Sequence, residues 1–459
     1  MGALAWQGGE MEPVLIVALA AVCTVLPLWI GMRCGVVGYV SPLHLLAYFS
    51  FFGFFLKVSV YAYAPDLAFY RRFALTPQAD LKGAIYLGSF IVMICLGYLI
   101  AYSAATVGPC AWAAREVAGG ITRRGGLFTC ALAVTIFTIA LVLRARGVGL
   151  LDQGVLAGLN TSKQIHVNAD GIGATLAGIK TFFVVPKFAF ILLFAHGLAR
   201  GSQISFIWAG ILAVVLVLIA IISGDRFELI EMAIFALATY AITGRQIGFR
   251  AVMIGGGALC VIGVVSAYMT ALRLGGDGSP AALLLQIVGS TYFLDINAAT
   301  MVTDRMDRAH MLLGQSYTWW SFGWVPRAVW PDKPAIDLGV FFKRDVMQIY
   351  TGGAFNVTGP GEAFINFGWF GLGMGGVLGA IYRKGEVALL CTKNTLRHGS
   401  AFLYPILFYP FVQATLQSSF SAFIVGAAAQ WVLIVVMTCL FVTRFSLWSL
   451  HRRVAYNAA

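Results

Sequence analysis

Four positively charged side chains lie at the ends of apolar stretches, where they could hold a negatively charged group. They are Arg226, Arg273, Arg327 and Lys333. Two of them belong to the segment FGWVPRAVWPDKP, residues 322–334, whose prolines fix the backbone and remove amide donors. The arginine guanidinium is a planar fork that matches phosphate oxygens, and lysine adds a point charge. This stiff aromatic frame favours binding of an anion such as a phosphate, although an arginine with a purely structural role gives the same pattern.

Arg226 stands in the first turn of an apolar stretch, directly after the turn signal SGD at residues 223–225. A helix N-terminus carries a positive partial charge that favours anions, so a cation at this place is mismatched with the helix dipole. A bound anion would remove the mismatch, because backbone amides and a guanidinium would converge on it. A salt bridge to Asp225 or Glu228 is the alternative. Arg273 is either an ordinary boundary arginine or a third cation facing the same cleft.

Three side chains are candidates for a catalytic base: His310, Glu362 and Asp225. His310 comes first because its imidazole titrates near neutral pH and can accept or donate a proton. It stands in the charged run at residues 295–317, however, and such a run is typical of a solvated loop. Glu362 begins an apolar stretch, where its carboxylate either complements the helix dipole or serves as a base.

Aromatic residues surround Arg327. The stretch YTWWSFGWVPRAVWP, residues 317–331, holds clustered tryptophans, a pattern typical of an aromatic belt at a membrane surface. Such rings anchor a loop to the membrane.

The elements that must position these residues are membrane-spanning helices. Of the 459 residues, 60% are hydrophobic and 11% are charged, and the mean hydropathy is +0.85. This balance excludes a water-soluble domain of the same length. Stretches long enough to cross the roughly 30 Å hydrocarbon core recur along the chain. We predict eleven spans, at about residues 13–32, 42–63, 84–103, 127–145, 174–198, 204–222, 227–243, 250–272, 361–382, 401–420 and 422–444.

The charges between the spans predict the orientation, because Lys and Arg near membrane segments stay on the cytoplasmic side. With the N-terminus outside and the C-terminus inside, the cytoplasmic segments contain fourteen Lys and Arg but only two acids, whereas sixteen of the nineteen acids lie on the other side. The net charge of +12 is then mainly a signal of topology, and binding to nucleic acid is not expected. The leader carries two acids and no Lys or Arg, unlike a cleavable signal peptide.

The spans divide the chain into three parts. Residues 1–272 hold spans one to eight, residues 273–360 form an outward loop, and residues 361–459 hold the last three spans and a cytoplasmic tail. At roughly 90 residues, the loop is far longer than a connector and is expected to be functional. Apolar residues at helical spacing in residues 280–299 predict a helix on the membrane surface or packed under the loop.

Several chemistries have no motif in the sequence. It contains no GxxxxGK[ST], HExxH or GxSxG, and no cysteine lies in an outward segment. We therefore expect no cofactor and no metal. A bundle with arginines at its outer end and a long capping loop suits a lipid-linked pyrophosphate, a substrate that brings its own leaving group.

This arrangement resembles the Wzy-type polymerases that join lipid-linked oligosaccharide repeat units of bacterial O-antigen, enterobacterial common antigen and exopolysaccharide. The similarity rests on the GDR turn at residues 224–226, the P-x-x-x-WP-x-x-P element at residues 326–334 and the segment GPGEAFINFGWFG at residues 359–371. The first 200 residues match only in hydrophobic layout.

The resemblance implies a glycosyltransferase of the GT-C type at the periplasmic face of the inner membrane. It would move a growing glycan from undecaprenyl pyrophosphate to the sugar end of a new repeat unit, with a flippase and a chain-length regulator as partners beside membrane lipid. Cations are needed where the pyrophosphate leaves, and a base is needed near the acceptor hydroxyl. Arg226, Arg273 and Arg327 fit the first role, with Lys333 in support. For the sugars, the resemblance implies contacts with the aromatic rings of Tyr317, Trp324 and Trp330.

Two other functions share part of the pattern. An O-antigen ligase uses the same donor but passes finished glycan to lipid A core or protein, so only its product distinguishes it. A lipid-linked sugar flippase or exporter, which is not an enzyme, predicts charges deep inside many spans and a paired repeat. In this sequence the charges concentrate in outward loops, and no repeat is visible.

Overall fold

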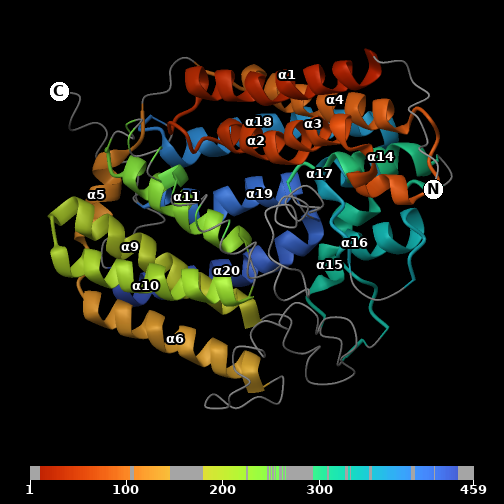
Figure 1. The fold of residues 1–459 in the computed structure, drawn as a ribbon. Helices are drawn as coiled ribbons and strands as arrows, with labels where there is room; N and C mark the ends of the chain where they lie inside the picture. The colour runs from red at the N-terminus through yellow and green to blue at the C-terminus, as the bar shows by residue number, and fades with distance from the viewer. Residues whose placement is uncertain are drawn as a thin grey trace.

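The computed structural model describes most of the chain as a bundle of helices (Figure 1). Its described residues form no β-strand. They are residues 11–103, 108–144, 179–223, 226–245, 293–307, 310–325, 329–330, 332–350, 354–393, 399–417 and 419–442, with single positions between 248 and 264.

The bounds of the helices follow in chain order. The first half contains α1 (Met11–Cys34), α2 (Pro42–Ser50), α3 (Leu56–Tyr63), α4 (Ala79–Ile100), α5 (Ala111–Gly119), α6 (Arg124–Arg144), α9 (Val184–Arg200), α10 (Gln203–Ser223) and α11 (Arg226–Ile242). The second half contains α14 (Ile296–Arg305), α15 (Trp320–Gly323), α16 (Leu338–Phe341), α17 (Thr358–Phe367), α18 (Leu372–Leu390), α19 (Tyr409–Gln417) and α20 (Phe420–Phe441). Short 3-10 or π turns include η1 (Phe51–Phe55), η3 (Phe69–Arg72), η7 (Gln315–Thr318), η8 (Phe342–Val346) and η11 (Tyr404–Phe408).

The chain is an all-α, multi-pass membrane protein. Eight helices in its described part are long and apolar enough to cross a membrane, and each coincides with a predicted span. They are Glu12–Cys34, Pro42–Tyr63, Ala79–Ile100, Arg124–Leu141, Thr181–Arg200, Gln203–Ala220, Thr358–Leu390 and Phe420–Phe441. Helices dominate because they satisfy every backbone polar group internally, which the hydrocarbon core requires.

The other three predicted spans differ in kind. The seventh is a shorter apolar helix, Glu231–Ile242, within α11. The tenth is not one regular helix, because η11 with its π geometry leads into α19. The eighth, residues 250–272, lies mostly outside the described residues. The total of eleven spans therefore stays a prediction, as does the helix at residues 280–299, of which only the end is described.

The centre of the bundle is the pair α4 and α18, which pack backbone against backbone. A Cβ atom added at Gly97 would lie 1.9 Å from the carbonyl oxygen of Gly376, and one at Gly379 would lie 2.0 Å from that of Ile94. Such distances exclude any side chain, so glycine is required for this approach. Small residues at helix contacts in membranes permit dispersion contacts along the whole backbone.

One end of the bundle, the α5 end, is defined by contacts between segments far apart in sequence. The Arg115 Nε donates to the carbonyl oxygen of Thr243 at 2.6 Å, and Arg124 donates to the Ser202 hydroxyl at 3.1 Å. Pro109 forms an isolated backbone bridge with Cys391. All these segments were predicted to be cytoplasmic.

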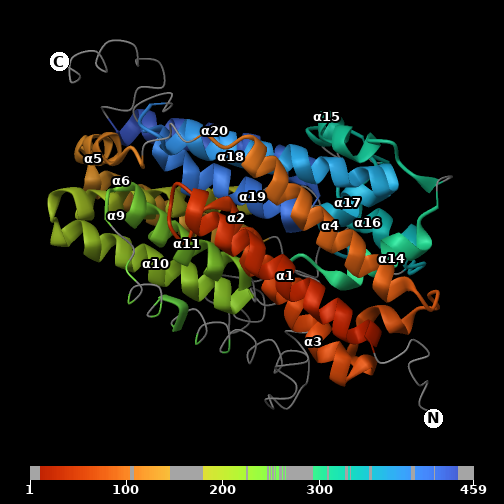
Figure 2. The same ribbon diagram turned by 90° about the horizontal axis from the view of Figure 1, so that it is seen from above.

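The opposite end, the α14 end, joins segments that were predicted to face outward (Figures 1 and 2). The Phe69 amide donates to the Asn297 side chain at 3.1 Å, and the Thr76 amide donates to Asp304 at 3.0 Å. The described part thus groups the connecting segments as the charge pattern predicts. Which end faces the cytoplasm stays a prediction.

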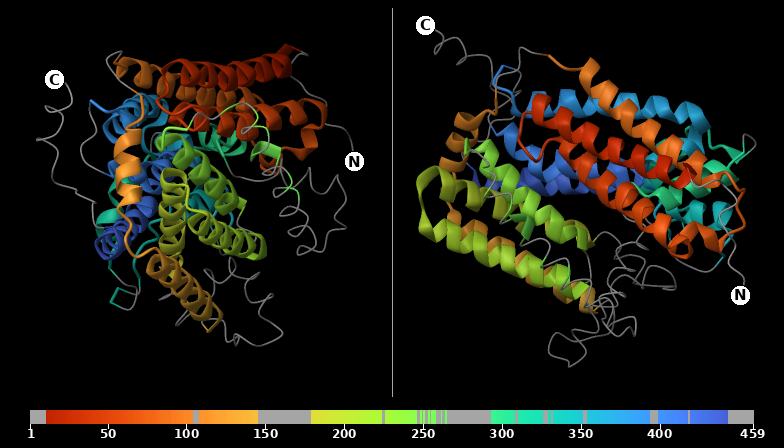
Figure 3. Two further views of the ribbon diagram at one scale, coloured as in Figure 1. Left: turned by 90° about the vertical axis from the view of Figure 1, so that its left-hand side faces the viewer. Right: turned by 45° about the horizontal axis from the view of Figure 1, so that its top comes forward.

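The helices form two groups joined by α20. In one group, α1 to α4 pack with α14, α17 and α18, and in the other α5, α6, α10 and α11 pack on α9 (Figure 3). Helix α20 contacts α9 and α6 on one side and α15, α19 and η7 on the other. It therefore ties the outward loop to both groups.

Candidate functional site

Two elements of the outward loop, η7 and α15, gather around the start of α20. The Phe420 amide donates to the Glu362 carboxylate at 2.9 Å, and the Ser421 hydroxyl donates to the carbonyl oxygen of Ser316 at 2.5 Å. A Cβ atom at Gly323 would lie 2.5 Å from the Val425 side chain, so α15 lies directly against α20. The first turns of α20 are thus the scaffold on which the loop is positioned.

Glu362 is the centre of this scaffold. Its side chain is buried, and its two carboxylate oxygens accept from the Ser316 hydroxyl at 2.8 Å and the Phe420 amide at 2.9 Å. The Asn366 side-chain amide donates to the Ser316 hydroxyl at 2.7 Å and so supports the same network. A buried carboxylate with two donors clamps three elements together. The geometry favours this role, while a role as base remains a prediction that requires the clamp to open.

Tyr317 lies beside this clamp rather than on an open surface. Its ring stacks on Phe367 with centroids 6.1 Å apart and meets Phe420 edge-on at 5.7 Å. Burial, with the nearby Glu362 carboxylate, raises the pKa of Tyr317 well above its usual range. The ring therefore packs in the loop, and contact with a glycan stays a prediction.

Lys333 binds back to the start of the tryptophan segment. The Lys333 Nζ donates to the carbonyl oxygens of Gly323 at 3.0 Å and Val325 at 2.8 Å, and so joins the stretches before and after residues 326–328. Trp324 and Trp330 remain 46% and 40% exposed. Lys333 thus holds the two described stretches of this segment together, while the tryptophan rings stay open to membrane or ligand.

His310 lies on the surface of the loop. Its side chain is 73% exposed, and its Nδ1 is within hydrogen-bond distance of the Asp307 carboxylate. The carboxylate orients the imidazole so that Nε2 points away from it and can act as an acceptor. Two residues later, the Leu312 amide donates to the carbonyl oxygen of Ile365 at 3.0 Å, which anchors this stretch to α17.

The other predicted cations and acid can be placed only in part. Arg226 is the first residue of α11, as the turn signal predicted. Both the start of α10 and the end of α11 lie at the α5 end, so α11 begins at its far end from there. Asp225, Arg273 and Arg327 lie outside the described residues, and so does the side chain of Arg226. Their convergence on one site therefore stays a prediction.

The structure also contains a buried polar cluster that sequence reasoning did not assemble. The Lys57 Nζ lies 2.7 Å from the Asp295 carboxylate, and both side chains are fully buried. Asp295 caps α14 by accepting from the Asn297 amide at 3.0 Å, and Asn297 also bonds to the Tyr61 hydroxyl. Lys57 lies within the predicted span 42–63, where a lone charge is costly, and its partner is 238 residues away in sequence.

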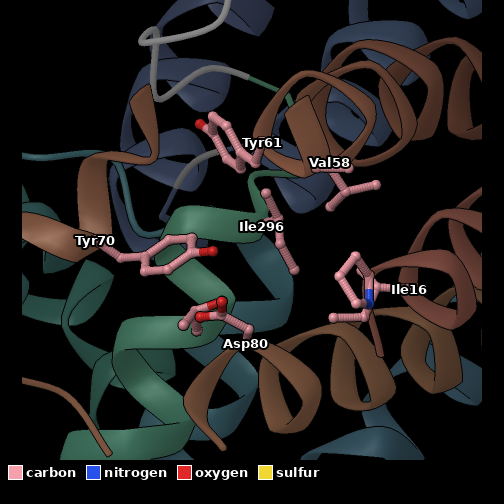
Figure 4. Close-up of a pocket in the computed structure, with 9 residues that line it drawn as sticks. Ile16, Val58, Tyr61, Tyr70, Asp80 and Ile296 are labelled. Carbon is pink, nitrogen blue, oxygen red and sulfur yellow. The ribbon is translucent and has the colours of Figure 1, made fainter. Parts of the chain in front are cut away.

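A pocket of about 330 Å³, part of it open to the exterior, lies at the α14 end between α1, α3, α4 and α14. Figure 4 shows the Tyr70 hydroxyl and the Asp80 carboxylate across from Ile16 and Val58. Asp80 is close to the Arg71 guanidinium at 3.7 Å. None of the predicted site residues lines this pocket. Among the described residues, no group of three His, Cys, Asp or Glu side chains could hold a metal ion.

Comparison with known proteins gives no relative. No protein-family model, no curated protein and no solved structure matches this chain. The function must therefore be argued from the residues and their geometry.

Proposed function

We propose that this protein is a polymerase that joins undecaprenyl-pyrophosphate-linked oligosaccharide repeat units into surface polysaccharide. In this proposal it is a GT-C-type glycosyltransferase of the bacterial inner membrane, with a periplasmic N-terminus and a cytoplasmic C-terminus. The observation that supports it best is the contact made by Lys333. Lys333 holds the stretches on either side of residues 326–328 together, and Gly323 in the first of them lies against the first turns of α20, a candidate membrane span.

A segment beside the start of a candidate span suits a substrate that is half in the membrane. The undecaprenyl chain lies in the hydrocarbon core, so its pyrophosphate is held at the membrane surface. Tryptophans prefer that depth, and the rings of Trp324 and Trp330 are exposed. Arg226 begins α11 and is proposed to face the same pyrophosphate. A guanidinium offers the pyrophosphate charge-assisted hydrogen bonds that strengthen as the leaving group gains charge.

The reaction follows from these parts. A hydroxyl oxygen of the incoming repeat unit attacks the anomeric carbon of the growing glycan. The bond from that carbon to the pyrophosphate oxygen breaks, undecaprenyl pyrophosphate leaves, and the hydroxyl proton passes to a base. In this proposal His310 is that base, because Asp307 orients it and leaves one ring nitrogen free to accept. Glu362 and Asp225 remain the other candidates.

The first test is gel analysis of surface glycan from cells that contain wild type, Arg327→Ala or Arg226→Ala as the sole copy. If the arginines stabilise the departing pyrophosphate, both variants should lose the ladder and show only single repeat units, because the leaving-group charge is no longer stabilised. Membrane levels of each variant are measured in parallel. A normal ladder in both variants would make the arginines structural and refute this reaction site.

One observation favours a second candidate, a lipid-linked sugar flippase or exporter. The Lys187 Nζ lies 2.8 Å from the Glu231 carboxylate between α9 and α11, with 13% and 17% of the side chains exposed. Charged groups within spans often mark a transport path. The two functions differ in the lipid-linked intermediate that a deletion strain accumulates: single units outside the membrane for a polymerase, and inside it for a flippase.

A further inference from the structure

A cationic feature that contains none of the predicted site residues lies at the α14 end. The Arg72 guanidinium carbon is 5.4 Å from the centroid of the Phe69 ring, and that of Arg305 is 5.5 Å from the centroid of the Phe73 ring. The two rings meet edge-on with centroids 5.5 Å apart. We name these four residues the arginine–phenylalanine platform.

The platform is built from three parts of the chain that hold one another in place. Phe355 stacks on Phe69 with centroids 4.9 Å apart. Arg305 donates to the carbonyl oxygens of Val346 at 2.8 Å and Ala74 at 3.3 Å. The turn before α4, the end of α14 and the end of the outward loop therefore fix both aromatic rings. Stacking on an aromatic face further restricts each guanidinium.

The charge of the platform is not neutralised by a carboxylate. Neither Arg72 nor Arg305 forms an ion pair with any residue in the described part of the chain, and Arg72 is exposed. Its neighbour Arg71, in contrast, lies 3.7 Å from Asp80. Asp304, next to Arg305, accepts from Thr76. Two positive charges on a fixed surface favour an anionic ligand.

The platform belongs to the connection between two candidate spans. The η3 turn stands between the end of Pro42–Tyr63 and the start of Ala79–Ile100. A guanidinium in so short a connection can reach the phosphates of membrane lipids.

We propose that the arginine–phenylalanine platform binds the pyrophosphate of the acceptor, the lipid-linked repeat unit whose own pyrophosphate is not cleaved. This proposal rests on the proposed polymerase function. Joining two lipid-linked molecules requires two pyrophosphates to be held at once, and only one of them leaves. Arg226 and Arg327 are assigned to the leaving group. Arg72, with Arg305 behind it, supplies a second anion site at the α14 end of the bundle.

The test is a binding measurement on the full chain in phosphatidylcholine nanodiscs. Undecaprenyl pyrophosphate is titrated into wild type, Arg72→Gln and Arg344→Gln, and bound lipid is counted by native mass spectrometry. Arg344 is the matched control, because it is also exposed and basic but is paired with Asp345 at 3.0 Å. Wild type and Arg344→Gln should bind two lipids. Arg72→Gln should weaken one binding event about tenfold, the effect of losing one charge-assisted contact.

Further variants separate the two proposals. Arg72→Lys keeps the positive charge but loses the planar guanidinium. The affinity of this variant for undecaprenyl pyrophosphate should therefore fall between those of wild type and Arg72→Gln. Unchanged binding in Arg72→Gln would overturn the platform as a site, while a lost ladder in Arg327→Ala would still support the polymerase. Equal competition by free inorganic pyrophosphate would overturn a lipid-linked ligand. If wild type binds no undecaprenyl pyrophosphate at all, the polymerase itself is refuted.

Discussion

Single side chains in this protein act through burial as much as through charge. Glu362 was predicted to be a functional residue from its position at the start of an apolar stretch. That position allowed two roles, complement of the helix dipole and catalytic base. In the structure its carboxylate accepts from Ser316 and Phe420. The sequence could not decide between the roles because both partners come from segments about 50 residues away. A glutamate at a helix start has the same local sequence whether its carboxylate faces solvent or is buried against other segments.

Glu362 can be tested with two substitutions that differ only in what they retain. Glu362→Ala should destabilise the protein by about 3 kcal/mol, because it leaves two buried donors without an acceptor. Glu362→Gln keeps one acceptor oxygen and nearly the same shape, so its loss should be about 1 kcal/mol. Thermal unfolding of the purified protein measures both changes.

The glycan ladder from the same variants then distinguishes a structural role of Glu362 as a clamp from a catalytic role as a base. A folded Glu362→Gln protein with a normal ladder would confirm the clamp, and a folded protein without a ladder would make Glu362 the base. An Ala variant as stable as wild type would contradict the clamp.

Charged residues within the spans show the limit of sequence reasoning at this scale. Burial is costly for a lone ion, so Lys57 and Glu231 each predict a partner. The partners are Asp295 and Lys187, but nothing in the spacing of the residues identifies them. Pairing depends on which helices become neighbours, and that information is tertiary.

Contacts between helices can be predicted only in part from the sequence. The closely spaced glycines of residues 371–376 predict close approach of a neighbouring helix. Gly375 and Gly376 do face α4, but a Cβ atom on Gly373 would meet nothing within 4 Å. The tightest contacts also include Gly379, one helical turn after Gly375. Composition thus predicts that a contact exists, and helical periodicity decides which glycines make it.

This contact can be tested on one helix with its own control. Gly379→Leu should push α4 and α18 apart and destabilise the protein by about 3 kcal/mol, because the new side chain overlaps the backbone of Ile94. Gly373→Leu should change stability by less than about 0.5 kcal/mol, because that position is exposed and unobstructed. The two variants are compared by thermal unfolding in the same detergent. Equal stability of the two would refute the backbone contact.

The whole molecule is the level at which the sequence is most informative. Hydropathy depends on composition over about 20 residues, and a membrane leaves few alternatives to a spanning helix. Eight predicted spans accordingly coincide with helices in the described part. The tenth is broken by π geometry at Tyr404–Phe408, where Pro405 removes a backbone donor and the turn packs against α18 and α11. The candidate site is less accessible to such reasoning, since its residues come from separate loops.

The orientation of the bundle is tested by labelling single cysteines in a cysteine-free chain. Gln78→Cys lies at the α14 end and Gln203→Cys at the α5 end, and both positions are exposed. In intact cells with a permeable outer membrane, a maleimide that cannot cross the inner membrane should label the first and not the second, because the charge pattern places the α5 end inside. The reverse result would invert the topology. Labelling of both positions would contradict the assignment of the two ends of the bundle to opposite sides of the membrane.

The clamp at the start of α20 also sets an order for biosynthesis. The Glu362 carboxylate and the Ser316 carbonyl accept from the amide of Phe420 and the hydroxyl of Ser421. These two donors are translated some seconds later, at the usual rate of about 5–20 residues per second. Until α20 has inserted, η7 and α15 lack the helix on which they pack, and these two acceptors lack the donors that α20 supplies. A ribosome that stalls before residue 420 would therefore leave this part of the loop exposed to proteases, and the cell would discard the incomplete chain.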